Sequence, residues 1–334
     1  MKILWQSKNG AVADSFKEGS LSAFINGGNA YDVQSALALS EKYNVSVDEF
    51  TIRRNESVLK YWLRMTKYKA DAELLIMEPF PIVYGKRIHG QKSIAMIHHI
   101  DPNIMKSGLY HRWYFNRLLK RASLCDMIVT VSEYWKNYFV QLGAKRVEVI
   151  YNSFDTTIYN APVDEKAFRS KFKIPEGKKI IYIGNAFREK GVYEVYDALK
   201  NTDYHLVMTG ATNRAADLDV QYMNLSRPEY LTLLRISSVV VANSLMIEGW
   251  NRIAHEALLS GTPVIGSGTG GMLELLTKAG QPIISTKEDI LLEIENVLRA
   301  RSSFAEAGLK YVRQFDQKYL KNRWEEIVEN VMKG

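Results

Sequence analysis

Short apolar runs alternate with longer amphipathic stretches along the whole chain. The runs have the length and composition of buried strands: Lys2–Trp5, Val45–Ile52, Leu74–Met77, Ser93–His98, Met127–Val131, Val147–Tyr151, Lys179–Ile183, His205–Thr209, Val239–Ala242, Pro263–Gly266 and Pro282–Ile284. The helix-length segments between them include Asn29–Tyr43, Glu133–Leu142, Val192–Lys200, Arg252–Ser260 and Lys287–Arg301. This alternation predicts the α/β class, with parallel sheets that carry helices on both faces.

The pattern breaks once, at Asn152–Lys178, which is polar, contains two prolines and lacks a long apolar run. We interpret this segment as the connection between two α/β domains, with a short helix at Asp164–Phe172. The last segment, Phe315–Lys333, predicts an amphipathic helix with one apolar stripe. Ligands of open α/β sheets bind outside the carboxyl ends of the strands, so we expect the chemistry in loops that follow strands, at a cleft between the domains.

Basic residues exceed acidic ones by 44 to 37, which gives a net charge of +7. Such a protein tends to bind phosphates, whether on nucleic acid, an anionic membrane surface or a small substrate, and the charge does not choose among them. Cys125 is the only cysteine, which excludes an intramolecular disulfide and indicates a reducing compartment. No apolar run approaches the roughly 20 residues that span a bilayer. We therefore expect a cytoplasmic protein that can still lie against a membrane face.

Two acids, Glu248 and Glu256, stand eight residues apart around the start of the predicted helix Arg252–Ser260. Glu248 is expected just ahead of the helix, and Glu256 within its first turns. A helix N-terminus offers unpaired N–H groups to a diphosphate, and a carboxylate there can accept two ribose hydroxyls. Gly249 would let the backbone approach a ligand closely. Taken alone, two glutamates favour the plainer interpretation of a solvent-facing helix.

The string that surrounds these acids is more specific. It runs E-G-W-N-x4-E-A-L-x-S-G-T-P-V-I-G-x-G-x-G-G-x-x-E-L from residue 248 and resembles the signature of the retaining, metal-independent glycosyltransferases of family four. Four further strings resemble the same family: VSEYWKNYFVQLG at 131–143, IYNSFD at 150–155, IIYIGNAFREKG at 180–191 and LVMTG at 206–210. The resemblance extends from about Ser93 to the end of the chain and fades over the residues before it.

The resemblance implies the GT-B fold, in which two Rossmann-like domains enclose the active site in the cleft between them. It assigns acceptor binding to residues 1–155, joined by a C-terminal helix at 315–334 that crosses back. It assigns the nucleotide-sugar donor to residues 156–314. The substrate would be a nucleotide diphosphate sugar, and neither a cofactor nor a metal is implied.

Carried over to single positions, the resemblance implies that Glu248 contacts the donor-sugar hydroxyls and that Glu256 holds the nucleotide ribose. It also implies that Lys190 neutralises the leaving diphosphate and that His98 lies near the transferred sugar. The remaining implied donor-binding residues are Gly27, Gly28, Gly184, Asn185, Arg188, Gly249, Trp250, Asn251 and Arg252. At Asn185 the family normally has an arginine. Asparagine lacks the cationic fork of arginine, so Arg188 is the candidate to supply that charge.

Plainer interpretations exist for several of these positions. Arg188 and Lys190 are also typical of a solvated surface loop, and Gly27-Gly28 of a simple turn. The HHxD string that begins at His98 hints at a metal, but adjacent side chains on an extended segment point in opposite directions. The Asp217–Asp219 segment resembles the Asp-x-Asp metal motif of another glycosyltransferase fold, and we interpret it as a solvated loop.

The segment Leu109–Arg121 is both basic and aromatic. One interpretation is an interfacial helix that presents its cations and Trp113 to anionic lipid. The alternative, which we favour, is a domain helix that turns a stripe of Tyr110, Tyr114 and Leu118 inward and leaves its charges in solvent.

These observations predict a retaining glycosyltransferase that moves a sugar from a nucleotide diphosphate sugar to a saccharide or lipid-linked acceptor, in polysaccharide or glycolipid synthesis. A nucleotide-sugar epimerase would share the architecture. A non-catalytic binding partner could also retain the fold, and Asn185 is the feature that favours it. Nucleic-acid binding is not expected, because no recognised motif accompanies the basic charge.

Overall fold

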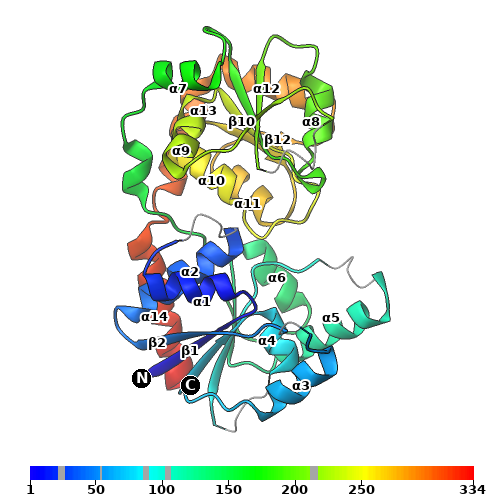
Figure 1. The fold of residues 1–334 in the computed structure, drawn as a ribbon, viewed down its shortest axis with the longest axis vertical. Coiled ribbons are helices and arrows are strands. Elements are labelled where there is room, and N and C mark those ends of the chain that lie inside the picture. The colour runs from blue at the N-terminus through cyan, green and yellow to red at the C-terminus, as the bar shows by residue number, and fades with distance from the viewer. Residues whose placement is uncertain (22–26, 53–54, 86–89, 102–106, 211–216) are drawn as a thin grey trace. The chain divides into compact units, whose positions relative to one another are not determined.

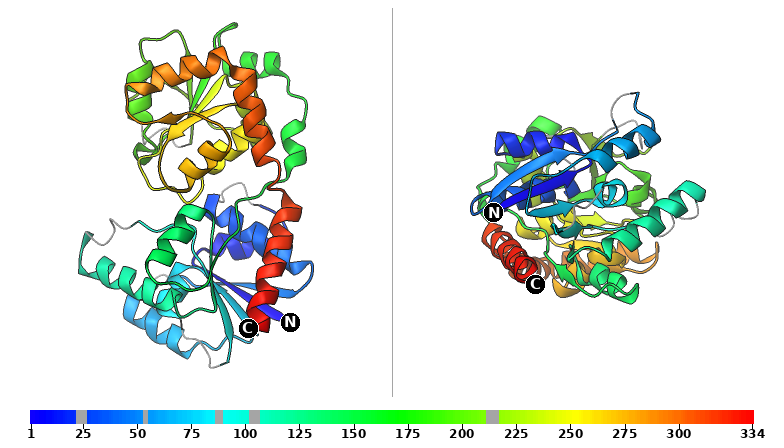
Figure 2. Two further views of the ribbon diagram at one scale, coloured as in Figure 1. Left: turned by 180° about the vertical axis from the view of Figure 1, so that it is seen from behind. Right: turned by 90° about the horizontal axis from the view of Figure 1, so that it is seen from below.

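The computed structural model describes residues 1–21, 27–52, 55–85, 90–101, 107–210 and 217–334. It divides into two compact units, one formed by Met1–Ser153 with Gln317–Gly334 and the other by Phe154–Asp316. Each unit is a six-stranded sheet covered by helices (Figures 1 and 2). The predicted α/β class with two Rossmann-like domains is confirmed.

The first unit contains a purely parallel sheet. Its elements are β1 (Lys2–Ser7), α1 (Gly10–Glu18), α2 (Gly27–Ser40), β2 (Asn44–Glu49), α3 (Val58–Lys67), β3 (Leu74–Met77), α4 (Pro79–Tyr84), β4 (Lys92–Met96), α5 (Leu109–Ala122), β5 (Met127–Thr130), α6 (Glu133–Gln141), β6 (Val147–Val149) and α14 (Gln317–Lys333). The strand order is β2-β1-β3-β4-β5-β6, so the direction of winding reverses between β1 and β3.

The C-terminal helix α14 belongs to this first unit, where it packs on α2. Its buried stripe consists of Leu320, Trp324, Ile327, Val328 and Val331. The ring of Trp324 meets that of Trp5 at a centroid distance of 5.3 Å, which anchors the helix to strand β1. The apolar stripe predicted for the last helix is therefore confirmed.

The second unit contains the other parallel sheet. Its elements are the 3₁₀ turn η2 (Thr156–Asn160), α7 (Glu165–Phe172), β7 (Ile180–Asn185), η3 (Arg188–Lys190), α8 (Val192–Leu199), β8 (His205–Thr209), β9 (Gln221–Met223), α9 (Arg227–Ile236), β10 (Val239–Ala242), α10 (Arg252–Leu259), β11 (Val264–Ser267), α11 (Gly270–Lys278), β12 (Ile283–Ile284), α12 (Asp289–Arg299) and α13 (Arg301–Val312). The order β12-β11-β10-β7-β8-β9 reverses between β7 and β10.

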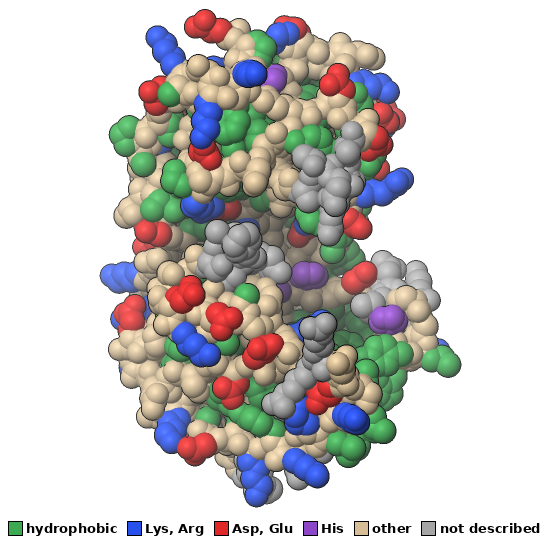
Figure 3. All heavy atoms as spheres, viewed as in Figure 1, with side chains coloured by type: hydrophobic (Ala, Val, Ile, Leu, Met, Phe, Trp, Pro, Cys, Tyr) green, Lys and Arg blue, Asp and Glu red, His purple; other side chains and the backbone are tan. Residues whose placement is uncertain are grey.

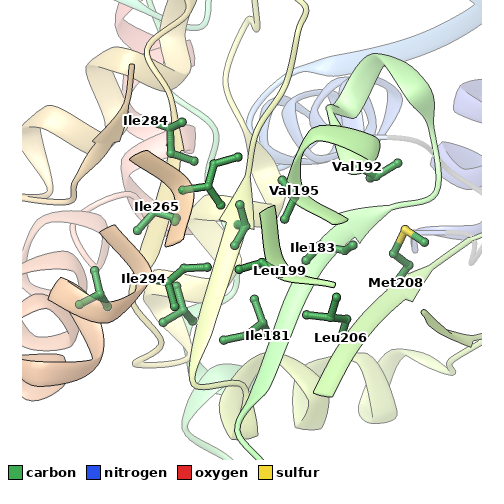
Figure 4. Close-up of a cluster of buried hydrophobic side chains, with 14 of the residues drawn as sticks. Ile181, Ile183, Val192, Val195, Leu199, Leu206, Met208, Ile265, Ile284 and Ile294 are labelled. Atoms are coloured by element: carbon green, nitrogen blue, oxygen red, sulfur yellow. The ribbon is translucent and has the colours of Figure 1, made fainter. Parts of the chain in front are cut away.

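The core of the second unit lies between its sheet and the helices α8 and α12. Figure 4 shows side chains from β7, α8, β8, β11 and α12 packed together in this layer. Ile181 of β7 and Val239 of β10 pair in register, and both are completely buried. Continuous apolar strands fit this arrangement, because helices cover both faces of a parallel sheet.

Some elements differ from the sequence-based prediction. Strand β9 was not predicted, because only Met223 of its three residues is buried and the apolar signal is weak. The helix predicted at Lys287–Arg301 stops at Arg299, because Ala300 leaves the helical conformation at φ −123° before α13 begins. The helices α1, α3, α4, α9, α11 and α13 were also not predicted.

The inward stripe predicted for the segment Leu109–Arg121 is wrong in part. The buried side chains of α5 are Phe115, Leu118 and Ala122, whereas Tyr110 is 47% exposed. The helix is rotated by about one residue relative to the prediction, since aromatic content alone did not reveal which stripe meets the sheet. In the part of the chain that the structure describes, no helix is long and apolar enough to span a bilayer.

Candidate functional site

The second sheet reverses its winding between β7 and β10, and the loops that follow these two strands lie side by side at its carboxyl edge. Ligands of doubly wound sheets bind at this kind of switch point. The two loops make direct contact, since the Leu245 N–H donates to the Glu189 carbonyl at 2.9 Å. Gly191 follows the first loop at φ +67°, and a Cβ there would lie 2.0 Å from the Asn243 carbonyl oxygen. Only glycine allows so close an approach.

Lys190 and Glu248 meet across these loops. The Lys190 ammonium donates to the Glu248 carboxylate with an Nζ–Oε1 distance of 2.5 Å. The Glu248 side chain is 11% exposed and that of Lys190 is 33% exposed, so the carboxylate is the buried partner. Of the three charged residues to which the resemblance assigns donor contacts, Lys190, Glu248 and Glu256, the first two are therefore in contact.

The backbone at Glu248 is held by the glycines that begin α11. The Gly271 N–H donates to the Glu248 carbonyl at 2.8 Å. A Cβ on Gly270 would lie 2.3 Å from the same oxygen, and Gly270 has φ +57°. The glycine pair in the family-like string thus fixes the position of the Glu248 peptide, which in turn aims its carboxylate at Lys190.

The end of β7 carries the position at which the family normally has arginine. Gly184 is buried at φ +89°, and the Asn185 carboxamide oxygen accepts from the Thr209 hydroxyl at 2.7 Å. Asn185 is therefore tied to the neighbouring strand β8. Arg188 is exposed and stacks over the Tyr193 ring at 5.3 Å, so its guanidinium is engaged by an aromatic face.

The start of α10 is ordered by Asn251 and Trp250. Asn251 is the N-cap, and its side-chain oxygen accepts from the Ala254 N–H at 2.9 Å, which leaves fewer free N–H groups than the sequence suggested. The Trp250 indole N–H donates to His255 Nδ1 at 3.0 Å, and both rings are buried. Burial and the charge of Arg252 lower the pKa of His255 to about 3, so this histidine is neutral. Gly249 lies in a buried bend just before this cap.

Glu256 has a different set of partners from Glu248. Its Oε1 accepts from the Arg227 guanidinium at 2.5 Å and from the Tyr159 hydroxyl at 2.8 Å. Burial, reinforced by the charge of Glu256, raises the pKa of Tyr159, which therefore keeps the proton that it donates. Arg252 stacks over the Phe154 ring at 4.3 Å. Among these described contacts, none joins Glu256 to Lys190 or Glu248.

The first unit has its own switch point, between β1 and β3. Glu78, the residue after β3, is 7% exposed and accepts from the Lys8 N–H at 3.0 Å. Burial and the charge of Asp32 raise the pKa of Glu78 to about 8. The ring of His98 contacts Asp32 with an Nε2–Oδ1 distance of 3.0 Å. Two carboxyl groups, one after β3 and one on α2, and the imidazole that follows β4 therefore lie near one another in the first unit.

The other predicted residues of the first unit lie near this group in the fold. Gly27 and Gly28 form the first turn of α2, the helix that carries Asp32, rather than a turn ahead of it. His98 is partly buried and His99 is exposed, as expected for neighbours on an extended segment. Among the described residues, no group of three or more His, Cys, Asp or Glu side chains is arranged to hold a metal ion. Asp217 is exposed and accepts from the Tyr193 hydroxyl at 3.0 Å.

Sequence reasoning missed five residues of these clusters: Asp32, Glu78, Tyr159, Arg227 and His255. Asp32, Glu78, Tyr159 and Arg227 come from elements distant along the chain and belong to none of the family-like strings, whereas His255 occupies an unspecified position within the string that begins at residue 248. Glu78 alone had a usable signal, because it directly follows the fully apolar run Leu74–Met77. A polar residue at the end of a buried strand is expected at the ligand edge of the sheet.

Comparisons with known proteins match both units of the chain. The family model described as Glycosyltransferase Family 4 matches residues 45–158, and the model described as Glycosyl transferases group 1 matches residues 164–308. An uncharacterized glycosyltransferase of Methanocaldococcus jannaschii is 25% identical over 257 residues, which are 72% of this chain and 67% of that protein.

Two solved structures share the whole fold. Sucrose-phosphate synthase from Thermosynechococcus elongatus has a TM-score of 0.78 at 17% identity and covers 99% of both chains. Anabaena HepE in complex with UDP-glucose has a TM-score of 0.76 at 16% identity, over 99% of this chain and 100% of that one. The fold and the two family models define this chain as a GT-B glycosyltransferase. Within that class it resembles the family-four glycosyltransferases, as its sequence motifs predicted.

Proposed function

We propose that this glycosyltransferase moves a sugar from a nucleotide diphosphate sugar to a saccharide or lipid-linked acceptor, with retention at the anomeric carbon and without a metal. The observation that carries the proposal is the contact between the Lys190 ammonium and the Glu248 carboxylate at the switch point of the second sheet. A cation and a carboxylate at one strand edge match the two ends of a sugar diphosphate: the ammonium suits the phosphates, and the carboxylate suits the sugar hydroxyls.

In the proposed reaction, the bond between the anomeric carbon and the diphosphate oxygen breaks while the acceptor oxygen bonds to the same face of that carbon. Negative charge grows on the leaving diphosphate, where Lys190 stabilises it in place of a metal. The acceptor hydroxyl gives its proton to the departing phosphate oxygen. In the proposed reaction, donor binding exchanges the Lys190–Glu248 ion pair for two substrate contacts.

Glu256 is proposed to accept the ribose hydroxyls of the donor nucleotide. Its Oε1 accepts hydrogen bonds from Arg227 and Tyr159. These two hydrogen-bond donors replace water around the nearly buried carboxylate, to which the ribose hydroxyls would then bind. The remaining donor contacts that we propose come from Gly184, Arg188 and the backbone at 249–252.

UDP-glucose is the first donor to test, because HepE has been crystallised with UDP-glucose and also with UDP and glucose. The wild-type chain, supplied with UDP-glucose and a panel of sugar and lipid-linked acceptors, is expected to release UDP and form a glucoside. The anomeric configuration of the product, read by NMR, should match that of the donor. Excess EDTA should leave the rate unchanged.

The matched variant is Glu248→Gln, which keeps the shape of the side chain and removes its charge. We expect a loss of about 100-fold in the transfer rate, with UDP affinity preserved, as for removal of one strong transition-state contact. Equal loss of UDP binding and transfer would remove Glu248 from the sugar subsite. An isomerised sugar from donor alone, or an inverted product, would contradict the proposed reaction.

A further inference from the structure

Two helices of the first unit, α3 and α5, present large hydrophobic side chains to solvent. The strongly exposed ones are Leu109 at 87%, Leu59 at 64%, Tyr110 at 47%, Leu63 and Trp113 at 45%, Val58 at 44% and Trp62 at 37%. Figure 3 shows hydrophobic side chains gathered on one face over the region where α3, α4 and α5 lie. Two tryptophans and three leucines of this kind on neighbouring helices are unusual for a solvent-exposed surface.

Helix α4 contacts both α3 and α5, so the three helices are neighbours in the first unit. The Tyr84 hydroxyl of α4 hydrogen-bonds to that of Tyr110 on α5. The Tyr84 ring also lies 5.4 Å from Tyr61 of α3 and 6.0 Å from Trp113 of α5. We call the exposed residues of α3 and α5 the aromatic face.

The exposed side chains are not the inward stripes of their helices. Tyr61 and Met65 are the buried side chains of α3, and Phe115 and Leu118 are those of α5. Each helix is therefore already anchored to the unit by a separate apolar stripe. The residues of the aromatic face are therefore not needed to pack the two helices onto the unit. Their exposure to water is unfavourable and calls for a separate explanation.

The charges on α3 and α5 are all of one sign. The two helices contain the cations Lys60, Arg64, Lys67, Arg112, Arg117, Lys120 and Arg121, and neither contains an aspartate or glutamate. Three of the seven are occupied: Arg64 pairs with Glu56 at 2.8 Å, Arg117 donates to the Val83 carbonyl, and Arg121 donates to the Gly85 carbonyl.

The other four cations, Lys60, Lys67, Arg112 and Lys120, are exposed and form no ion pair within the described part of the chain. Exposed cations beside exposed leucine and tryptophan are typical of protein surfaces that bind at a lipid interface. The rings enter the headgroup layer, and the long basic side chains reach the phosphates.

We propose that the aromatic face docks this protein on an anionic lipid surface. Charge complementarity favours this occupant, because the four exposed cations of α3 and α5, on helices that contain no acid, suit a layer of negative headgroups better than a protein surface of mixed charge. The proposal is independent of the donor chemistry, since partitioning onto lipid requires no nucleotide sugar.

The test is co-sedimentation of the full chain with two kinds of lipid vesicle. The neutral vesicles contain phosphatidylcholine alone, and the anionic vesicles contain phosphatidylcholine with roughly 30% phosphatidylglycerol. We expect binding to the anionic vesicles, weak binding to the neutral ones and loss of binding in high salt. Lys60→Gln/Lys120→Gln should weaken partitioning by about 25-fold, from about fivefold for each cation near the surface. Leu59→Ser/Leu109→Ser should weaken it by a similar factor.

Matched controls lie on the other unit. Lys166→Gln/Lys310→Gln removes the same charge from exposed positions, and Leu292→Ser removes a leucine that is 56% exposed. Both should bind like wild type. Equal weakening by the control pair would mean that net charge, and not this face, attracts the vesicle. Binding that ignores lipid charge, or no binding at all, would overturn the proposal.

Tryptophan quenching places the contact without depending on affinity. Brominated lipid should quench Trp62 and Trp113, and the loss of both in Trp62→Phe/Trp113→Phe should abolish the quenching while binding persists. Quenching that survives in this variant would assign lipid contact to another surface and refute the docking face.

Discussion

Glu78 should make the stability of the first unit depend on pH. It is 7% exposed, and burial with the charge of Asp32 raises its pKa to about 8 from a value of 4.5 for an ordinary glutamate. Between these two values the folded protein holds a proton that the unfolded chain has released. The stability that Glu78 contributes is therefore complete below about pH 4.5 and is lost as the pH rises through 8. The groups that face it are Asp32, His98, the Ser7 hydroxyl and the Lys8 N–H.

One proton held only by the folded state changes the free energy of unfolding by about 1.4 kcal/mol per pH unit. Between pH 6.5 and 8 the unit should lose about 2 kcal/mol. Glu78→Gln imitates the protonated side chain, so its stability should be flat over this window. Urea denaturation followed by tryptophan fluorescence is the assay, because the first unit holds five of the six tryptophans, Trp5, Trp62, Trp113, Trp135 and Trp324.

The control is Glu176→Gln, which removes an exposed carboxylate from the second unit and should keep the wild-type slope. A variant that is only less well packed would lose stability equally at each pH. The reasoning is refuted if Glu78→Gln retains the wild-type slope, or if the wild type itself is flat between pH 6.5 and 8.

Three further predictions concern the second unit. Gly191→Ala should cost about 3 kcal/mol in urea denaturation, from a Cβ clash and a left-handed φ, whereas Gly177→Ala, with φ +77° and open space, should cost about 1. Lys190→Met removes the ammonium that donates to the mostly buried Glu248 carboxylate; a loss of about 1–2 kcal/mol in stability and about 100-fold in transfer is expected, and unchanged transfer would exclude Lys190 from the reaction. The pKa of His255 is lowered to about 3, so between pH 6.5 and 5 the unfolded chain binds a proton that the folded protein does not. The free energy of unfolding of the second unit should therefore fall by about 2 kcal/mol over this range, and His255→Gln should remove that loss.

The sequence by itself determined the architecture and part of the site. Strands such as Leu74–Met77 and Val239–Ala242 are predictable from the sequence because a strand covered on both faces must be apolar throughout. The family-like string located Glu248 and Lys190 because their backbone positions depend on neighbouring glycines, which are local in the chain. Helix α5 was found, but its inward face was not, since a helix rich in aromatic residues offers more than one apolar stripe.

Tertiary structure alone decided which distant groups meet. Lys190 and Glu248 are 58 residues apart, and only the strand order, with β7 beside β10, brings their loops together. The same holds for Asp32 and His98, which are 66 residues apart. The raised pKa of Glu78 likewise depends on burial beneath helices that its own sequence neighbours do not specify. Hydrophobic pattern is a local property of the chain, whereas ion pairing and desolvation depend on how the sheet is wound.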